Sequence, residues 1–162
     1  MIFKTLWRKK EKTEDKKSVL EIKTDVFKYR TELEMRFTDL DMMGHVNNAV
    51  YFTYMEIGRT KYWQQAIQWD WKKTGVVIGK ASNTYIKPLH LEDKISMYVR
   101  TSRIGNTSFD LEYILVKTKN GEEIICSKGK TVCVVYDYET KSPVPIPDRE
   151  RNKMIAFEQL DS

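Results

Sequence analysis

Six residues that can do chemistry lie within the stretch DLDMMGHVNN, residues 39–48. A carboxylate can act as a general base or as a nucleophile, and a glycine lets the backbone come close to a ligand. Aspartate and asparagine are also common in turns and helix caps, so a structural role for the stretch stays open, and for Asp39 turn structure is expected. The six residues are Asp39, Asp41, Gly44, His45, Asn47 and Asn48.

A helix is predicted directly after this stretch. Residues 49–67 are apolar almost throughout, which is typical of a buried helix, and Asn47 or Asn48 is a natural N-cap. A helix N-terminus offers unpaired backbone N–H groups and the positive end of a dipole, and both suit a developing oxyanion. A carboxylate just upstream of such a terminus fits attack on a carbonyl group.

The rest of the chain has the pattern of strands. Apolar and polar residues alternate over 27–37, 94–103 and 108–117, and strands are also expected over 76–87 and 123–137. Asn120-Gly121 is typical of a tight hairpin turn, and Pro143, Pro145 and Pro147 are expected to end regular pairing. The order predicts an α+β fold in which an antiparallel sheet of five to six strands wraps around one long buried helix.

Length and composition predict one domain with a core, because the chain has 162 residues of which 41% are hydrophobic. We expect a flexible basic segment over 1–26 and a single domain over 27–162. No apolar run approaches the length of about 18 residues that a membrane span needs. The first residues do not resemble a secretory signal, so a cytoplasmic location is expected.

The net charge of +5 and a pI of about 9.1 permit an anionic ligand such as a nucleic acid, an acidic surface or a phosphorylated cofactor. Much of the excess lies in the first 17 residues. A basic tail usually serves solubility, so we expect no nucleic-acid partner. The two cysteines, Cys126 and Cys133, are seven residues apart and are expected on opposite faces of a strand, unpaired. No Cys/His spacing fits a metal site.

The stretch from Arg36 to Tyr51 resembles hotdog-fold acyl thioesterases of the 4-hydroxybenzoyl-CoA thioesterase type, whose pattern is roughly D-x-D-x-x-G-x-V-x-x-x-x-Y before a helix. Its GHVNN part is also similar to plant and bacterial acyl-ACP thioesterases. The resemblance extends over most of residues 27–147. It implies the hotdog fold, a homodimer or tetramer with the active site at the subunit interface, and thioester hydrolysis without a cofactor.

Carried over residue by residue, the resemblance makes Asp41 the carboxylate that activates water or attacks the thioester carbonyl. It makes the backbone N–H of Asn48 the donor to the carbonyl oxygen, and it lets His45 orient water or substrate. The acyl-ACP enzymes carry an asparagine where this chain has Met43, which favours the simpler arrangement with a single aspartate. His90 is expected in a surface loop. Further substrate-binding candidates are Gly44, Asn47, Tyr51, Glu56, Arg103 and Ser108, with Lys128 and Lys130 as possible phosphate contacts.

The sequence therefore predicts an acyl-CoA thioesterase, and three alternatives stay open. An acyl-ACP thioesterase is supported by His45, Asn47 and Asn48. A non-catalytic acyl-CoA binding module would use the same fold. A hotdog hydratase would need a D-x-N-P-x-x-H-like pattern that this chain lacks. The acyl chain, the carrier and the role of the basic segment are not predicted.

Overall fold

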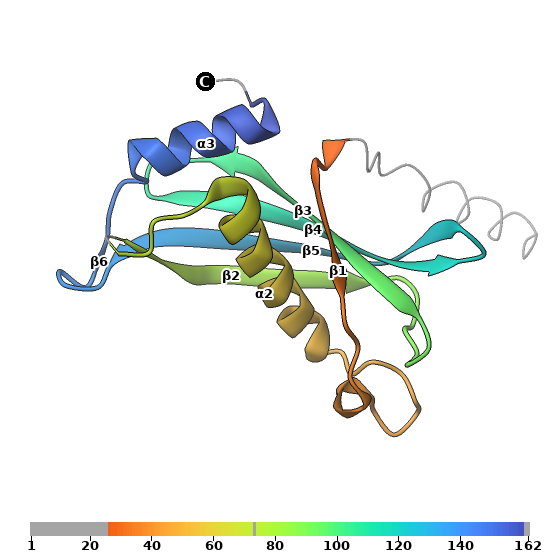
Figure 1. The fold of residues 1–162 in the computed structure, drawn as a ribbon. Coiled ribbons are helices and arrows are strands. Elements are labelled where there is room, and N and C mark those ends of the chain that lie inside the picture. Colours follow the sequence, from red (N-terminus) through yellow and green to blue (C-terminus); the bar gives the residue numbers. More distant parts are fainter. Residues whose placement is uncertain (1–25, 73, 161–162) are drawn as a thin grey trace, which may run out of the picture.

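A computed structural model of the chain describes residues 26–72 and 74–160, and it contains one curled antiparallel sheet with a long helix across one face (Figure 1). The strand order is β1-β3-β4-β5-β2, and a short sixth strand pairs with β5. The strands are β1 (Tyr29–Leu33), β2 (Gly75–Tyr85), β3 (Lys94–Ile104), β4 (Ser108–Lys119), β5 (Glu122–Asp137) and β6 (Ser142–Pro143). The expected basic segment, 1–26, lies almost wholly outside the described residues.

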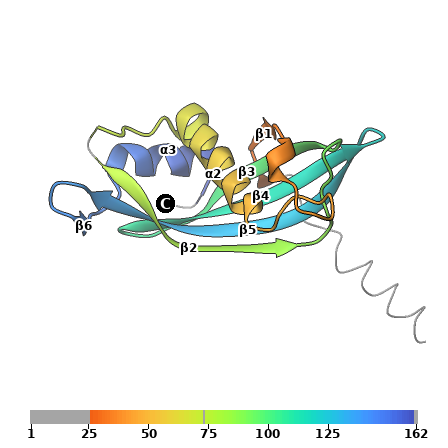
Figure 2. The ribbon, with the colours of Figure 1, turned by 90° about the horizontal axis from the view of Figure 1, so that it is seen from below.

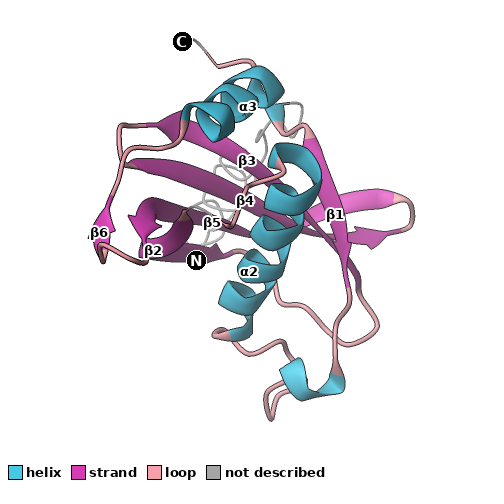
Figure 3. Cartoon of the chain, turned by 60° about the vertical axis from the view of Figure 1, so that its left-hand side comes forward, coloured by secondary structure: helices cyan, strands magenta, loops and turns pink. Residues whose placement is uncertain are grey.

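The long helix confirms the central prediction and corrects one detail of it. Helix α2 (Val50–Tyr62) continues as a π-helical turn, η3 (Trp63–Ile67), so its length matches the predicted 49–67. Its burial does not match, because Phe52 and Ile57 are exposed on the side away from the sheet. Within one chain, the sheet therefore covers only one side of α2, and the prediction of a helix buried on all sides was wrong (Figure 3).

The core fills the space between α2 and the face of the sheet that α2 covers, which we call the inner face. Gly58 lets the helix approach β3 closely, since a β-carbon there would lie 2.6 Å from the sulfur of Met97. The largest fully buried side chains include Tyr54, Tyr62, Tyr113, Phe109, Met55 and Met97. None of the helices in the described part of the chain is long and apolar enough to cross a membrane.

Most strands lie close to their predicted ranges, and the Asn120-Gly121 turn has the positive φ angles of 53° and 80° that a tight hairpin requires. The first strand is shorter than predicted. It ends at Leu33 instead of Phe37, because a 3-10 turn, η2 (Phe37–Asp39), forms there and Arg36 and Asp39 cap it reciprocally. The alternation of apolar and polar residues does not predict a turn that is stabilised by side-chain hydrogen bonds.

The prediction for the cysteines was wrong about their faces. Both thiols are free and both belong to the main core cluster beneath α2. The reason is an irregularity in β5, where the register against β4 jumps from Ser127 to Ile125 and leaves Cys126 as the extra residue. A bulge of this kind reverses the alternation of faces, which the spacing of seven residues could not reveal.

Helix α3 (Asp148–Glu158) was not predicted. It starts after Pro147 with Asp148 and Glu150 in its first turn, which favours a helix N-terminus. Its last residue, Glu158, is buried and accepts hydrogen bonds from the Tyr62 hydroxyl at 2.6 Å and the Thr101 backbone N–H at 3.1 Å. Burial raises the pKa of the Glu158 carboxyl. This contact ties α3 to both α2 and β3.

Replacing Tyr62 by phenylalanine removes the shorter of these two bonds and leaves the buried carboxylate with one donor. We expect Tyr62→Phe to lower the free energy of unfolding by about 1–3 kcal/mol, the usual cost of an unsatisfied buried polar group. Tyr98→Phe is the matched control, because the Tyr98 hydroxyl bonds to Glu123 at 2.7 Å at an exposed position. Urea unfolding of both variants measures the difference, and equal losses would contradict the anchoring role of Glu158.

Candidate active site

The loop between β1 and α2 is anchored by a buried carboxylate. Asp39, with 1% of its surface exposed, accepts hydrogen bonds from the Arg36 backbone N–H at 2.9 Å and from the Tyr54 hydroxyl at 2.8 Å. The Arg36 guanidinium adds an ion pair at 2.8 Å. Burial by itself would raise the pKa of Asp39, but the bonds from Arg36 and Tyr54 outweigh it and hold the pKa below its usual value. The expectation that Asp39 is structural is confirmed.

Asp41 is held in a tight turn of the same loop. One of its carboxylate oxygens, Oδ1, accepts from the backbone N–H groups of Met43 at 2.8 Å and His45 at 3.1 Å. Gly44 lies inside this turn with φ of +74°, a conformation in which a β-carbon would be strained. Among the described residues, no donor bonds to the other oxygen, Oδ2.

A cavity of about 330 Å³ opens where this loop meets the N-terminus of α2 and the end of β2. The lining combines the polar residues Asp41, His45 and Asn48 with the aromatic residues Tyr51 and Tyr85. The lining residues are Asp41, His45, Val46, Asn48, Tyr51, Tyr85, Ile86, Lys87 and Pro88. Four of the residues that the sequence pointed to, Asp41, His45, Asn48 and Tyr51, are thus brought together.

Among the described residues, the five backbone N–H groups from Val46 to Val50 include one open donor. The N–H groups of Val46, Asn47 and Val50 bond to backbone oxygens, and that of Ala49 bonds to the Asn47 side chain at 2.9 Å. The N–H of Asn48 has no acceptor within the described part of the chain. Asn47 is therefore the capping side chain, and Asn48 presents a free N–H at the positive end of the helix.

Two tyrosines close the inner end of the cavity. The Tyr85 hydroxyl donates to the backbone oxygen of Asn48 at 2.9 Å, and its ring meets that of Tyr51 edge to face at 5.0 Å between centroids. Burial raises the pKa of Tyr51 to about 12, so its hydroxyl stays protonated at neutral pH. Tyr85 was not singled out from the sequence, where it is one aromatic residue within a strand pattern.

His90 lies in the partly exposed connection between β2 and β3, as expected for a surface loop, and its ring lies beside that of His45. The two imidazole rings meet edge to face, with 4.9 Å between their centroids. His90 Nδ1 lies 3.7 Å from the Asp93 carboxylate, which also pairs with Lys117 at 2.9 Å. No spacing signal could have found this contact, since it depends on how the β2–β3 connection folds against the loop of residues 36–48.

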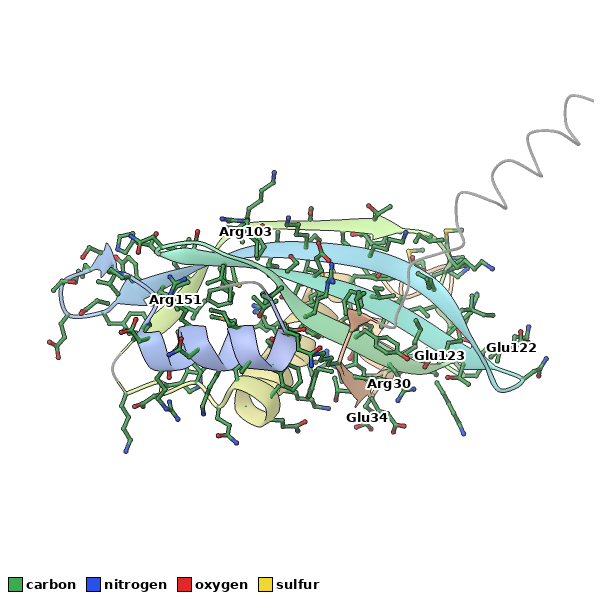
Figure 4. The ribbon with its side chains drawn as sticks, turned by 90° about the horizontal axis from the view of Figure 1, so that it is seen from above. Arg30, Glu34, Arg103, Glu122, Glu123 and Arg151 are labelled. Atoms are coloured by element: carbon green, nitrogen blue, oxygen red, sulfur yellow. The ribbon has the colours of Figure 1, made fainter. Side chains whose placement is uncertain are left out.

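Five of the six predicted substrate-binding residues do not line this cavity, and of these Gly44 and Asn47 belong to the adjoining loop. Glu56 is largely exposed on α2, 4.0 Å from Arg59. Ser108 begins β4, and Arg103 lies near the end of β3, where its guanidinium pairs with Asp110 at 2.8 Å. Arg103 and Arg151 lie at one end of the sheet and Glu122 and Glu123 at the other (Figure 4). The ten residues from Lys94 to Arg103 put about 30 Å between the cavity's end of β3 and Arg103.

A larger hollow of about 600 Å³ lies on the outer face of the sheet and holds Lys128 and Lys130. Three of its charged side chains are paired, since Arg100 bonds to Glu112 at 2.8 Å and Lys130 lies 3.0 Å from Asp110 beside the hollow. It contains no free backbone donor beside a carboxylate comparable to Asp41 and Asn48. The smaller cavity is therefore the candidate active site, because it can hold a carbonyl group between a hydrogen-bond donor and a carboxylate.

Comparison with known proteins agrees with this chemistry. Residues 35–154 match the family model described as the thioesterase-like superfamily. A chloroplastic acyl-acyl carrier protein thioesterase of Arabidopsis thaliana, ATL3, is 30% identical over 82% of this chain and 70% of its own length. A Thermus thermophilus thioesterase whose structure was determined with coenzyme A and Zn is 34% identical, with a TM-score of 0.72 over 85% of this chain and 99% of that one. A thioesterase predicted in Bacillus stearothermophilus is 27% identical, with a TM-score of 0.69 over 80% and 95% of the two chains.

The bonds of the Asp39 carboxylate to Arg36 and Tyr54 should make the stability of the fold depend on pH. Asp39→Asn removes the ion pair with Arg36 and weakens the bond from Tyr54, and we expect a loss of about 1–3 kcal/mol in the free energy of unfolding. Because the pKa of Asp39 is lowered in the folded state, its contribution is present at neutral pH and is lost as the pH falls below about 4.

Unfolding measured between pH 3 and pH 7 tests this prediction. Wild type should lose stability on the acid side more steeply than Asp39→Asn does. Asp137→Asn is the control, because the carboxylate of Asp137 also has a lowered pKa but caps an exposed turn. A pH dependence of Asp39→Asn equal to that of wild type would mean that Asp39 does not carry the effect.

Proposed function

The chain belongs to the thioesterase-like superfamily and is a thioester hydrolase, and on this premise we propose that its substrate is a coenzyme A thioester of a carboxylic acid. The observation that carries the proposal is that the same cavity is lined by Asp41 and by Asn48, whose backbone N–H has no acceptor among the described residues. Reaction at a thioester needs both a donor for the carbonyl oxygen and a base or nucleophile beside the carbonyl carbon.

In the proposed reaction the carbonyl oxygen accepts a hydrogen bond from the Asn48 N–H, and the helix dipole stabilises the charge that develops on it. Oδ2 of Asp41, which has no other donor among the described residues, takes a proton from the attacking water or attacks the carbonyl carbon itself. The carbon–sulfur bond then breaks. The acyl group leaves as a carboxylic acid after addition of water, and the sulfur leaves as the thiol after gaining a proton.

His45 is proposed to orient the water or the substrate. Its backbone N–H holds the Asp41 carboxylate at 3.1 Å, and its ring is fixed by contact with His90. Gly44 acts through its backbone, by permitting the turn, and Asn47 acts through its side chain, whose Oδ1 accepts from the Ala49 N–H at the start of α2. Tyr51 contributes an apolar wall for the acyl group.

A carrier-protein thioester is the alternative substrate. The relative ATL3 is named an acyl-acyl carrier protein thioesterase, whereas the Thermus thioesterase was crystallised with coenzyme A. Met43 supports a coenzyme A thioester over a carrier-protein thioester, because acyl-ACP thioesterases have an asparagine at this position of the motif. The Met43 side chain points into solvent, with 77% of its surface exposed, and contributes no polar group to the cavity.

A homodimer is proposed, joined through the free edge of the sheet. Strand β2 has eleven residues and pairs only with β5 in the described part of the chain, so its other edge is open (Figure 2). Val77 and Ile78 are exposed on this strand. A long edge strand without a partner, with exposed apolar side chains, favours pairing with a second copy. A second copy is also what could bring Glu56, Arg103 or Ser108 to an active site.

We expect Asp41→Asn to keep the fold and to lower the rate of thiol release from acyl-CoA esters at least about 100-fold, the range expected for loss of a general base. A panel from acetyl-CoA to palmitoyl-CoA with benzoyl-CoA gives the rates. Asp137→Asn is the matched control, because Asp137 also accepts two backbone N–H bonds from a turn, at 2.8 and 2.9 Å, but lies away from the cavity.

Near-normal rates for Asp41→Asn would show that Asp41 is not the base. Release only from carrier-protein thioesters would move the substrate to the alternative class. Binding of acyl-CoA without release from either carrier would favour a non-catalytic binding module.

The proposed dimer predicts a mass close to twice the 19.2 kDa of one chain in sedimentation equilibrium. Replacing both Val77 and Ile78 by lysine places like charges across the proposed interface, and we expect the double variant to dissociate at concentrations where wild type stays dimeric. A wild-type mass of one chain, or an undiminished dimer in the double variant, would contradict pairing through β2.

A further inference from the structure

Helix α2 does not cover the inner face of the sheet evenly. The residues of β3 and β4 on this face are buried, whereas the face of β2 that continues it is partly open. Ala81, Asn83 and Tyr85 alternate on this face of β2, opposite Thr131, Gly129 and Ser127 of β5. Ala81 is exposed and Tyr85 has 46% of its surface exposed. Between them, Asn83 is turned inward beneath α2.

The amide of Asn83 has no hydrogen-bond partner. Both its Oδ1 and its Nδ2 are buried, and neither bonds to any of the described residues. Its surroundings are close, because a β-carbon at Gly129 would lie 3.4 Å from Asn83 Oδ1 and 2.6 Å from the sulfur of Met55. A buried amide without a hydrogen bond lowers the free energy of unfolding by about 1–3 kcal/mol. We therefore expect Asn83 to bond to a group that does not belong to the described residues.

Other polar groups gather at the same place. Tyr113, which pairs with Gly129 across the sheet, bonds through its hydroxyl to Thr131 at 2.8 Å. The Arg59 side chain is only 14% exposed, and its ion-pair partner among the described residues, Glu56, is 4.0 Å away. Burial raises the pKa of Tyr113, and the nearby charge of Arg59 opposes that rise. The core beneath α2 is thus polar at this position.

This polar position lies directly beyond the inner wall of the catalytic cavity. Tyr85 lines that cavity. Asn83 lies two residues before Tyr85 on the same face of β2, at a distance of about 7 Å along the strand. Between the cavity and Asn83 lies the Tyr85 ring, which is held by a hydrogen bond to the Asn48 oxygen and by its edge-to-face contact with Tyr51. Turning this partly exposed ring outward breaks a hydrogen bond worth about 1 kcal/mol and an aromatic contact worth about 0.5–1.5 kcal/mol.

We propose that Asn83 forms a subsite for an oxygen substituent on the acyl group, so that the enzyme prefers acyl chains carrying a hydroxyl or keto oxygen several carbons from the thioester. An amide can both donate to and accept from such a group. A site built to bond a substrate oxygen discriminates strongly against the analogue that lacks it, because its own polar atoms are then left unpaired. The proposal rests on the proposed thioesterase function and names the class of its acyl group.

The test compares octanoyl-CoA with three derivatives that carry one hydroxyl group at carbon 3, 5 or 8, with thiol release as the readout. We expect wild type to favour the 5- or the 8-hydroxy ester over octanoyl-CoA in kcat/KM by at least about tenfold. Asn83→Leu should lose this preference while it keeps or raises the rate with octanoyl-CoA. Removing an unpaired buried amide should also leave the unfolding temperature unchanged or higher.

Thr84→Val is the matched control, because Thr84 is the next residue of β2 and lies on the outer face, so the preference should survive in it. Asn83→Val also lacks the amide, and it replaces Asn83→Leu in the test if the larger leucine side chain prevents folding. Equal rates of wild type with all four esters, or a preference that persists in both Asn83 variants, would overturn the subsite and leave the thioesterase intact. Release from none of the four esters would overturn the proposed acyl-CoA substrate and the subsite together.

Discussion

The candidate site depends on one buried carboxylate. Asp39 joins the loop to α2 through the Tyr54 hydroxyl at 2.8 Å and joins it to the end of β1 through Arg36. Its backbone oxygen also accepts from the Asn47 N–H at 2.9 Å, which sets the loop against the first turn of the helix. Because a buried charge is tolerated only when it is fully paired, this network has one geometry. The turn that holds Asp41 follows it directly.

The distribution of donors at the start of α2 gives the site its chemistry. Four of the five N–H groups from Val46 to Val50 are occupied by the backbone or by Asn47, and the remaining one belongs to Asn48, a residue that lines the cavity together with Asp41. In the proposed reaction, a preorganised donor needs no rearrangement when charge develops on a substrate oxygen. Two backbone bonds fix one oxygen of the Asp41 carboxylate, and the other oxygen has no donor among the described residues.

The region between α2 and β2 contains the groups that have the fewest partners within one chain. In the part of the chain that the structure describes, one edge of β2 pairs with no strand, the Asn83 amide has no partner, and Arg59 has only Glu56 at 4.0 Å. A second copy paired along β2 and an acyl group reaching past Tyr85 would each use part of this region. The proposed dimer and the proposed subsite are therefore compatible, because one uses the strand edge and the other the face beneath the helix.

The sequence by itself determined the architecture and the centre of the site. Strand alternation and the long apolar helix are local patterns, and Asp41, His45 and Asn48 lie within eight residues of one another, so no long-range contact was needed to group them. Only the tertiary structure decided which other residues join them. His90 and Tyr85 reach the site through the β2–β3 connection, the bulge at Cys126 reverses the faces of β5, and α3 is anchored by Glu158 against Tyr62. These features arise from packing between segments far apart in the chain, and neither periodicity nor spacing carries that information.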